Sequence, residues 1–227
     1  MDDEIKIQKL LISLSQYSDK MVKKKIKKTI SKWKQYHKIS DLGMITRRYF
    51  VMNAFDGALT MLGVVIGAYI ANIGNPAIII SAGVAGSIAM GASGISGAYM
   101  TEKAERTKKL KDLESAMLSE LKNGLHKKSY KFAAAFAALV DGISPALAAM
   151  IVISPFFFVN PGIISFVNAF YLSITITLIV LTSLGIYLAK ISDESMIKYG
   201  VQMLIVGILT AFICIITSIL LGGSTAV

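Results

Sequence analysis

Five long segments of this chain contain no lysine or arginine, and this pattern limits the possible folds more than any other feature. The segments cover residues 49–73, 76–100, 132–158, 163–189 and 199–221. Each one meets the roughly 20 apolar residues that a helix needs to cross the hydrocarbon core of a bilayer. The first segment begins too far into the chain to be a cleaved signal peptide. We therefore predict an all-α polytopic membrane protein with five transmembrane helices.

The basic residues all lie outside these segments. The chain has 24 Lys and Arg against 14 Asp and Glu, a net charge of +10, although 54% of its residues are hydrophobic. All 24 bases fall in residues 1–48, 101–131 and 190–198, whereas the connections at 73–76 and 158–162 carry no charge. The positive-inside rule then predicts a cytosolic N-terminus and, after five crossings, a C-terminus outside.

The first 48 residues are predicted to form a basic cytosolic arm of amphipathic helices. Residues 49–221 would be the transmembrane domain, with residues 101–131 as a cytosolic helical extension between its second and third helices. In the arm, Ile30 and Trp33 alternate with lysines at helical spacing. Such a helix binds either nucleic acid or an anionic membrane surface. Because the arm directly precedes a membrane helix, we favour membrane lipid and expect no nucleic-acid partner.

Two aspartates are the only charged residues inside the five segments. Asp56 and Asp141 each precede a glycine, Gly57 and Gly142, two to three turns from the cytosolic start of the first and third helices. The likeness suggests a parallel repeat of two helix pairs followed by a fifth helix. An aspartate at this depth costs at least about 2.5–3.5 kcal/mol to insert. We therefore expect both carboxylates to face the bundle interior.

No intramembrane lysine or arginine is present to neutralise these two acids. Protonation, a bound cation or alternation between the two would stabilise them, and alternation is what a proton-coupled cation carrier requires. The alternative is an aspartate that stays protonated and bonds to a neighbouring helix. Met52, Asn53 and Thr60 fall on the same helix face as Asp56. Met90 of the second helix offers a soft thioether, which favours transition metals, although a core or lipid-facing role is the alternative.

The first two helices also contain a series of motifs with a recognisable order. They are Asp56-Gly57, Gly63-Val64-Val65-Ile66-Gly67-Ala68, Gly86-Ser87-Ile88-Ala89-Met90-Gly91, and then Ser96 and Tyr99. Over residues 50–105 this series resembles the vacuolar iron transporter family, and the rest of the chain resembles it mainly in topology. Members are five-helix homodimeric carriers that move Fe²⁺, and often Mn²⁺, out of the cytosol in exchange for protons. The resemblance implies that Asp56 and Met90 line the metal path.

The chain departs from that family at the cytosolic side of the second helix. Family members commonly have Gly-Glu-Tyr where this chain has Ser93-Gly94-Ile95. A membrane-proximal glutamate is therefore missing at Gly94. Asp141, which is not a usual family residue, is the candidate to supply the lost carboxylate.

A second departure concerns the extension at residues 101–131. Plant members insert a Glu-rich metal-collecting domain here, for which this segment is too short. Glu102 and Glu105 lie near one helical face and are candidates to attract incoming metal. The alternative is that they only form i, i+4 ion pairs with Arg106 and Lys109 on a solvated helix.

Together these features predict a secondary transporter rather than an enzyme. It would move Fe²⁺, Mn²⁺ or both out of the cytosol in exchange for protons, as a homodimer in the cell membrane. Its candidate metal ligands are Asp56, Met90, Asp141, Glu102 and Glu105, and no permanently bound cofactor is expected. One alternative is a non-transporting anchor or assembly protein whose arm binds lipid or a partner. Another is an intramembrane hydrolase with two acids, but the Gly-x-Gly-Asp signature of aspartyl proteases is absent.

Overall fold

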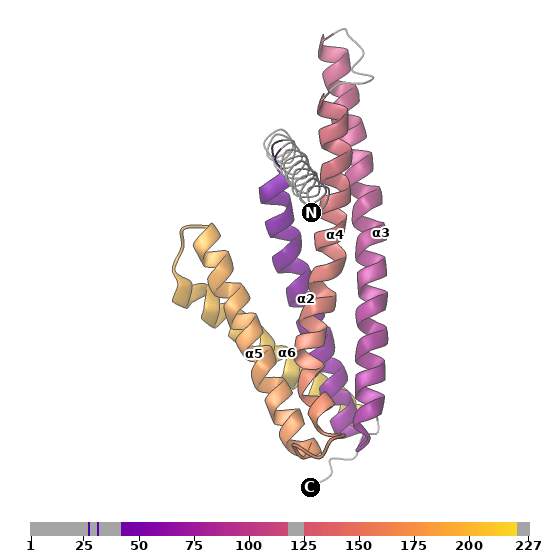
Figure 1. Cartoon of the computed structure of the whole chain (residues 1–227). Coiled ribbons are helices and arrows are strands. Elements are labelled where there is room, and N and C mark those ends of the chain that lie inside the picture. The colour runs from indigo at the N-terminus through magenta and orange to yellow at the C-terminus, as the bar shows by residue number, and fades with distance from the viewer. Residues whose placement is uncertain (1–26, 28–30, 32–41, 118–124, 222–227) are drawn as a thin grey trace, which may run out of the picture.

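The computed structural model describes residues 42–117 and 125–221 as continuous segments, together with residues 27 and 31 (Figure 1). Its long helices are α2 (Leu42–Ile70), α3 (Pro76–Met117), α4 (Leu125–Ile153), α5 (Phe166–Ile191) and α6 (Met196–Leu220). A short 3-10 helix, η1 (Ser154–Phe158), follows α4. Most of the basic arm predicted at residues 1–48 lies outside the described residues.

All five long helices are long and apolar enough to cross a membrane. A helix satisfies its backbone hydrogen bonds internally, and this is required where no water is present to replace them. The described residues contain no strand. The prediction of an all-α polytopic membrane protein is therefore confirmed. The first helix starts earlier than expected, at Leu42, so Arg47 and Arg48 belong to α2 rather than to a separate arm.

The helix bundle has one uncharged end and one charged end. The uncharged end carries the α2–α3 connection at residues 71–75 and the connection at residues 159–165 that leads into α5. At the charged end, α3 and α4 extend side by side beyond the other helices (Figure 1). The α5–α6 turn at residues 192–195 lies toward this end, where Asp193 adopts a positive φ of 53°. The charged and uncharged connections of the sequence thus lie at opposite ends of the bundle.

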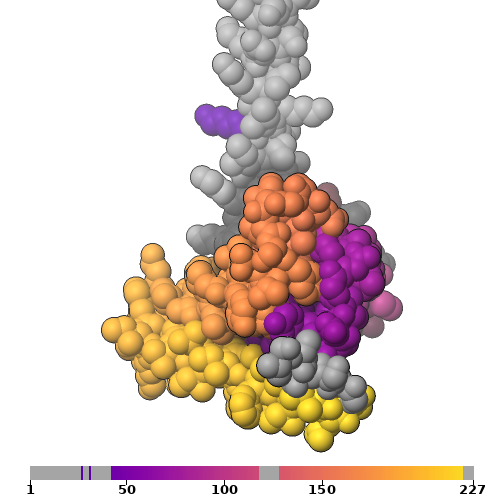
Figure 2. Space-filling model, turned by 90° about the horizontal axis from the view of Figure 1, so that it is seen from below, coloured from indigo at the N-terminus to yellow at the C-terminus, as the bar shows by residue number. Residues whose placement is uncertain are grey.

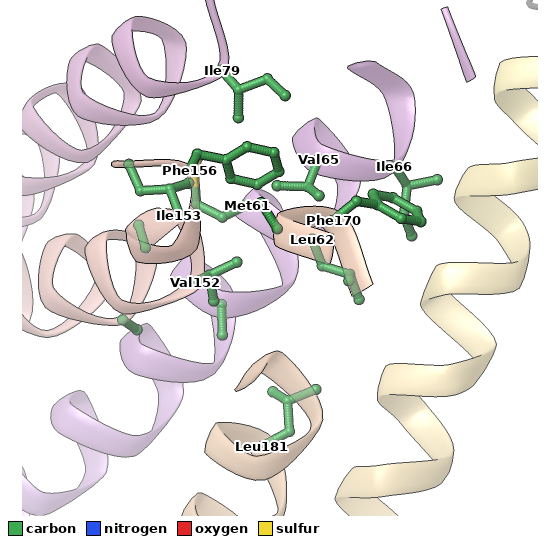
Figure 3. Packing of buried hydrophobic residues seen from close by; sticks show 14 of the residues in the cluster. Met61, Leu62, Val65, Ile66, Ile79, Val152, Ile153, Phe156, Phe170 and Leu181 are labelled. Carbon is green, nitrogen blue, oxygen red and sulfur yellow. The ribbon is translucent and has the colours of Figure 1, made fainter. Parts of the chain in front are cut away.

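The hydrophobic core lies toward the uncharged end. Phe156 of η1 is fully buried and packs beside Ile153 and Met61, with Val65 close by (Figure 3). The 3-10 helix η1 follows α4 directly, and this turn places the Phe156 side chain in the hydrophobic core. Helix α6 contributes no fully buried hydrophobic side chain to this core, and in the view from below it lies along one edge of the molecule (Figure 2). Its apolar outer surface is therefore suited to lipid.

Helix α4 packs against α2 and α3 through backbone contacts at glycines. A Cβ atom added to Gly57 of α2 would lie 2.2 Å from the carbonyl oxygen of Pro145 in α4. A Cβ added to Gly142 of α4 would lie 2.4 Å from the carbonyl oxygen of Gly91 in α3. Small residues allow membrane helices to approach this closely. The glycine of each Asp-Gly pair is thus the point where two helices meet.

Substitution of these glycines by alanine should destabilise the bundle. We expect Gly57→Ala and Gly142→Ala each to lower the free energy of unfolding by about 1–3 kcal/mol, because the added methyl group displaces a neighbouring backbone. The measurement is thermal unfolding of the detergent-solubilised chain.

Gly97→Ala is the matched control, since no atom lies within 4 Å of a Cβ at that position of α3. It should leave stability unchanged or raise it by up to about 1 kcal/mol, because alanine is the better helix former. Equal stability of all three variants would contradict the packing described here.

Candidate functional site

Asp141 is buried where α2, α3 and α4 meet. The residue is only 8% exposed, and its Oδ1 accepts a hydrogen bond of 2.6 Å from the Asn53 side-chain amide of α2. The same amide donates to the carbonyl oxygen of Tyr49 at 2.8 Å. These two bonds fix the Asn53 side chain between its own helix and α4. The prediction that this carboxylate faces the bundle interior is therefore correct for Asp141.

Gly94 of α3 leaves the space that the Asp141 carboxylate occupies. A Cβ at Gly94 would lie 2.9 Å from Asp141 Oδ2 and 3.1 Å from the Asp141 backbone carbonyl oxygen. Pro145, four residues later, has no N–H to donate to that carbonyl. The Asp141 carboxylate and the Asp141 backbone carbonyl oxygen, which lacks its helical N–H donor, therefore both lie beside Gly94. Gly94 is also the position at which the family glutamate, absent from this chain, would begin.

Asp56 has the opposite environment, although it lies within one turn of Asn53 on the same helix. Its side chain is exposed on the surface of the protomer, as are those of Met52 and Thr60. We call these three residues the α2 stripe. We expected both aspartates to face the bundle interior, and within the single chain Asp56 does not. The reason is that α2 places Gly57, not Asp56, against α4.

Met90 of α3 is partly buried and packs against the hydrophobic core. Within the described residues, no group of three or more histidine, cysteine or acidic side chains is placed to hold a metal ion. A single chain therefore does not assemble a metal site from such groups in this part of the structure. The predicted ligands Asp56, Met90 and Asp141 instead lie on three different helices.

Glu102 forms the ion pair considered as one alternative for the extension, but it is buried rather than on a solvated surface. It is 4% exposed, and its Oε2 accepts a 2.9 Å hydrogen bond from Arg106 Nε. Its Oε1 accepts a 3.1 Å bond from the hydroxyl of Tyr49, which joins α3 to α2. Both carboxylate oxygens are thus already in use. Glu105 is exposed and accessible to solvent.

Tyr49, Asn53 and Gly94 make contacts that the sequence did not reveal. Tyr49 meets its partner 53 residues further along the chain, and no local spacing reports such a contact. For Gly94, the sequence indicates only that a glutamate common in the family is missing at this position. Its role as the space for the Asp141 carboxylate depends on how closely α3 and α4 approach.

Removal of the Glu102 carboxylate should destabilise the charged end. We expect Glu102→Ala to lower the free energy of unfolding by about 3–5 kcal/mol, because it leaves the buried Arg106 guanidinium without its counter-charge. Glu105→Ala removes the same group from an exposed position of the same helix and should change stability by less than about 0.5 kcal/mol. Chemical denaturation of both variants tests this difference. Similar losses in the two would contradict a structural role specific to Glu102.

Comparison with known proteins identifies the family. Residues 106–218, which include Asp141 and run from the outer part of α3 into α6, match the sequence model of the VIT family. An uncharacterized protein of Methanocaldococcus jannaschii is 36% identical over 172 residues, which cover 74% of this chain and 85% of that protein. The chain belongs to the VIT family of membrane transporters.

Proposed function

We propose that this protein is a homodimeric, proton-coupled carrier that moves a divalent transition metal, Fe²⁺ or Mn²⁺, out of the cytosol. The observation that carries the proposal is the exposure of Asp56 on a membrane-spanning helix. Family membership supports the broader function, the transport of metal ions across a membrane.

An exposed carboxylate at this depth is costly when it faces lipid. The spans hold no lysine or arginine next to it that would neutralise it. A second copy of the chain, related by a two-fold axis, would cover the α2 stripe with the same stripe of its partner. The interface would then contain two Asp56 carboxylates and two Met52 thioethers. The thioethers disfavour the hard ions Mg²⁺ and Ca²⁺ and shift the preference toward softer transition metals such as Fe²⁺, whereas Mn²⁺ would be held mainly by the carboxylates.

Proton coupling follows from the absence of a fixed counter-charge. An acid without a cationic partner is stable in the membrane either protonated or beside a metal ion. We propose that Asp56 exchanges protons for metal, that Met90 adds a soft ligand, and that Asp141 is the second proton-exchanging acid. Glu105 on the exposed extension is the remaining candidate to attract incoming metal. Glu102 is assigned to the structural pair with Arg106.

The proposed orientation of the carrier in the membrane rests on the charged end of the bundle. By the positive-inside rule this end faces the cytosol, which places the N-terminus inside and the C-terminus outside the cell membrane. Metal would enter the α2 stripe from the charged end and leave at the uncharged end.

Asp56→Asn should abolish transport while leaving the fold intact, because asparagine keeps the size of the side chain but neither ionises nor releases a proton. We expect Fe²⁺ flux into proteoliposomes, driven by an outward-directed proton gradient, to fall at least about tenfold. Asp193→Asn is the matched control: it makes the same chemical change in the exposed α5–α6 turn, and asparagine tolerates the positive φ there.

Undiminished flux in Asp56→Asn would remove this residue from the pathway. Absence of flux in the unmodified protein, with every metal tested, would instead favour the anchor or assembly protein considered above.

The proposed dimer can be tested by cross-linking through the α2 stripe. In a Cys214→Ser background, Thr60→Cys should form a disulfide-linked dimer on mild oxidation, because residues near a two-fold axis meet their own copies. Ile179→Cys, at an exposed apolar position of α5, is the control and should remain monomeric on a denaturing gel. A cross-link at position 179 with none at position 60 would place the interface elsewhere.

A further inference from the structure

A cavity of about 430 Å³ lies between α3 and α4 at the charged end of the bundle. It is separate from the α2 stripe and from Asp141. Its α3 wall runs from Tyr99 to Glu114, and its α4 wall consists of residues 130, 131 and 134.

Positive charge dominates the lining of this cavity. Lys103, Arg106 and Lys111 contribute from α3 and Lys131 from α4, against a single acidic residue, Glu114. With Arg106 paired to Glu102, three lysines against Glu114 still leave an excess of positive charge, which repels a metal ion and attracts an anion. The cavity therefore differs in chemistry from the proposed metal path.

Arg106 is the buried member of this set and has an unused donor. Its side chain is 6% exposed, its Nε donates to Glu102, and its guanidinium lies 5.6 Å from the centre of the Tyr130 ring. Its Nη2 is buried and has no hydrogen-bond partner within the described part of the structure. A buried charged donor without a partner is unfavourable, and a planar guanidinium is well suited to the oxygens of a phosphate.

The position of the cavity along α3 places its inner end, at Tyr99 and Lys103, beside the lipid headgroups, while the rest extends into the aqueous phase. Tyr99 follows Pro76 by 23 residues, which corresponds to about 35 Å at the rise of an α-helix. The hydrocarbon core is about 30 Å thick, so Tyr99 lies at the membrane surface and Lys103 just beyond it. The Lys103 ammonium lies 5.9 Å from the centre of the Tyr99 ring. Aromatic and basic side chains commonly occupy this level.

We propose that this cavity binds a phosphate-bearing anion, with Arg106 as its buried anchor and Lys103, Lys111 and Lys131 around it. Phosphate is the shared chemistry of two sources, the headgroup of an anionic lipid and a free phosphate ion from the cytosol. Occupancy would neutralise the excess positive charge where α3 and α4 leave the membrane. The bound anion would thereby stabilise the paired extension of these two helices.

The test uses thermal unfolding of the full chain in a neutral detergent without metal. In one arm, sodium phosphate is compared with sodium chloride at matched ionic strength. In the other, micelles doped with phosphatidic acid are compared with micelles doped with phosphatidylcholine. A ligand at about four times its dissociation constant should raise the melting temperature by about 2–4 °C.

Two double variants with equal loss of charge make the test specific. Lys103→Gln with Lys131→Gln removes one lysine of the cavity from each helix, and the rise should disappear. Lys108→Gln with Lys128→Gln removes one exposed lysine from each helix outside the cavity, and the rise should persist.

A rise in the phosphate arm supports the proposal with a free phosphate as a sufficient ligand. A rise in the phosphatidic acid arm alone supports it with a lipid headgroup as the source. No rise in either arm, or an equal rise in both double variants, would overturn it.

Discussion

The backbone contacts of α4 with α2 and α3 determine which side chains of these helices are buried between them and which face outward. Gly57 brings α2 onto Pro145, and Gly91 brings α3 onto Gly142. Without a hydrophobic driving force between helices in lipid, such close approach supplies the packing energy. It also fixes the rotation of each helix about its axis. That rotation places Asp141 inside the three-helix contact and turns Asp56 outward.

Much of the fold could be predicted from the sequence because lipid imposes strict rules on length and charge. Five segments without lysine or arginine indicated five helices, and the distribution of these basic residues separated the two ends of the bundle. The candidate site was less predictable. The periodicity of α2 grouped Met52, Asn53, Asp56 and Thr60 on one face, but Asn53 instead bonds Asp141 of α4 while the other three are exposed. Periodicity does not say whether a face meets another helix or remains open.

The same limitation explains the result for Glu102. Its i, i+4 spacing to Arg106 predicted the ion pair, and the pair is present. Its burial depends on Tyr49, a residue on another helix, and on the long pairing of α3 with α4. A local pattern thus identified the partner but not the environment, and the environment decides whether a carboxylate is available to a ligand. The unused donor of Arg106 is likewise visible only in three dimensions.

The glycine contacts also limit how this transporter can move. A side chain at a helix interface can change rotamer and let its neighbours slide, whereas two backbones in contact have no such freedom. These contacts therefore favour a movement in which α2, α3 and α4 stay together. Alternating access in membrane carriers proceeds largely by rocking one group of helices against another. If the proposed transport proceeds in this way, the moving counterpart would be the α5–α6 hairpin or a second copy of the chain.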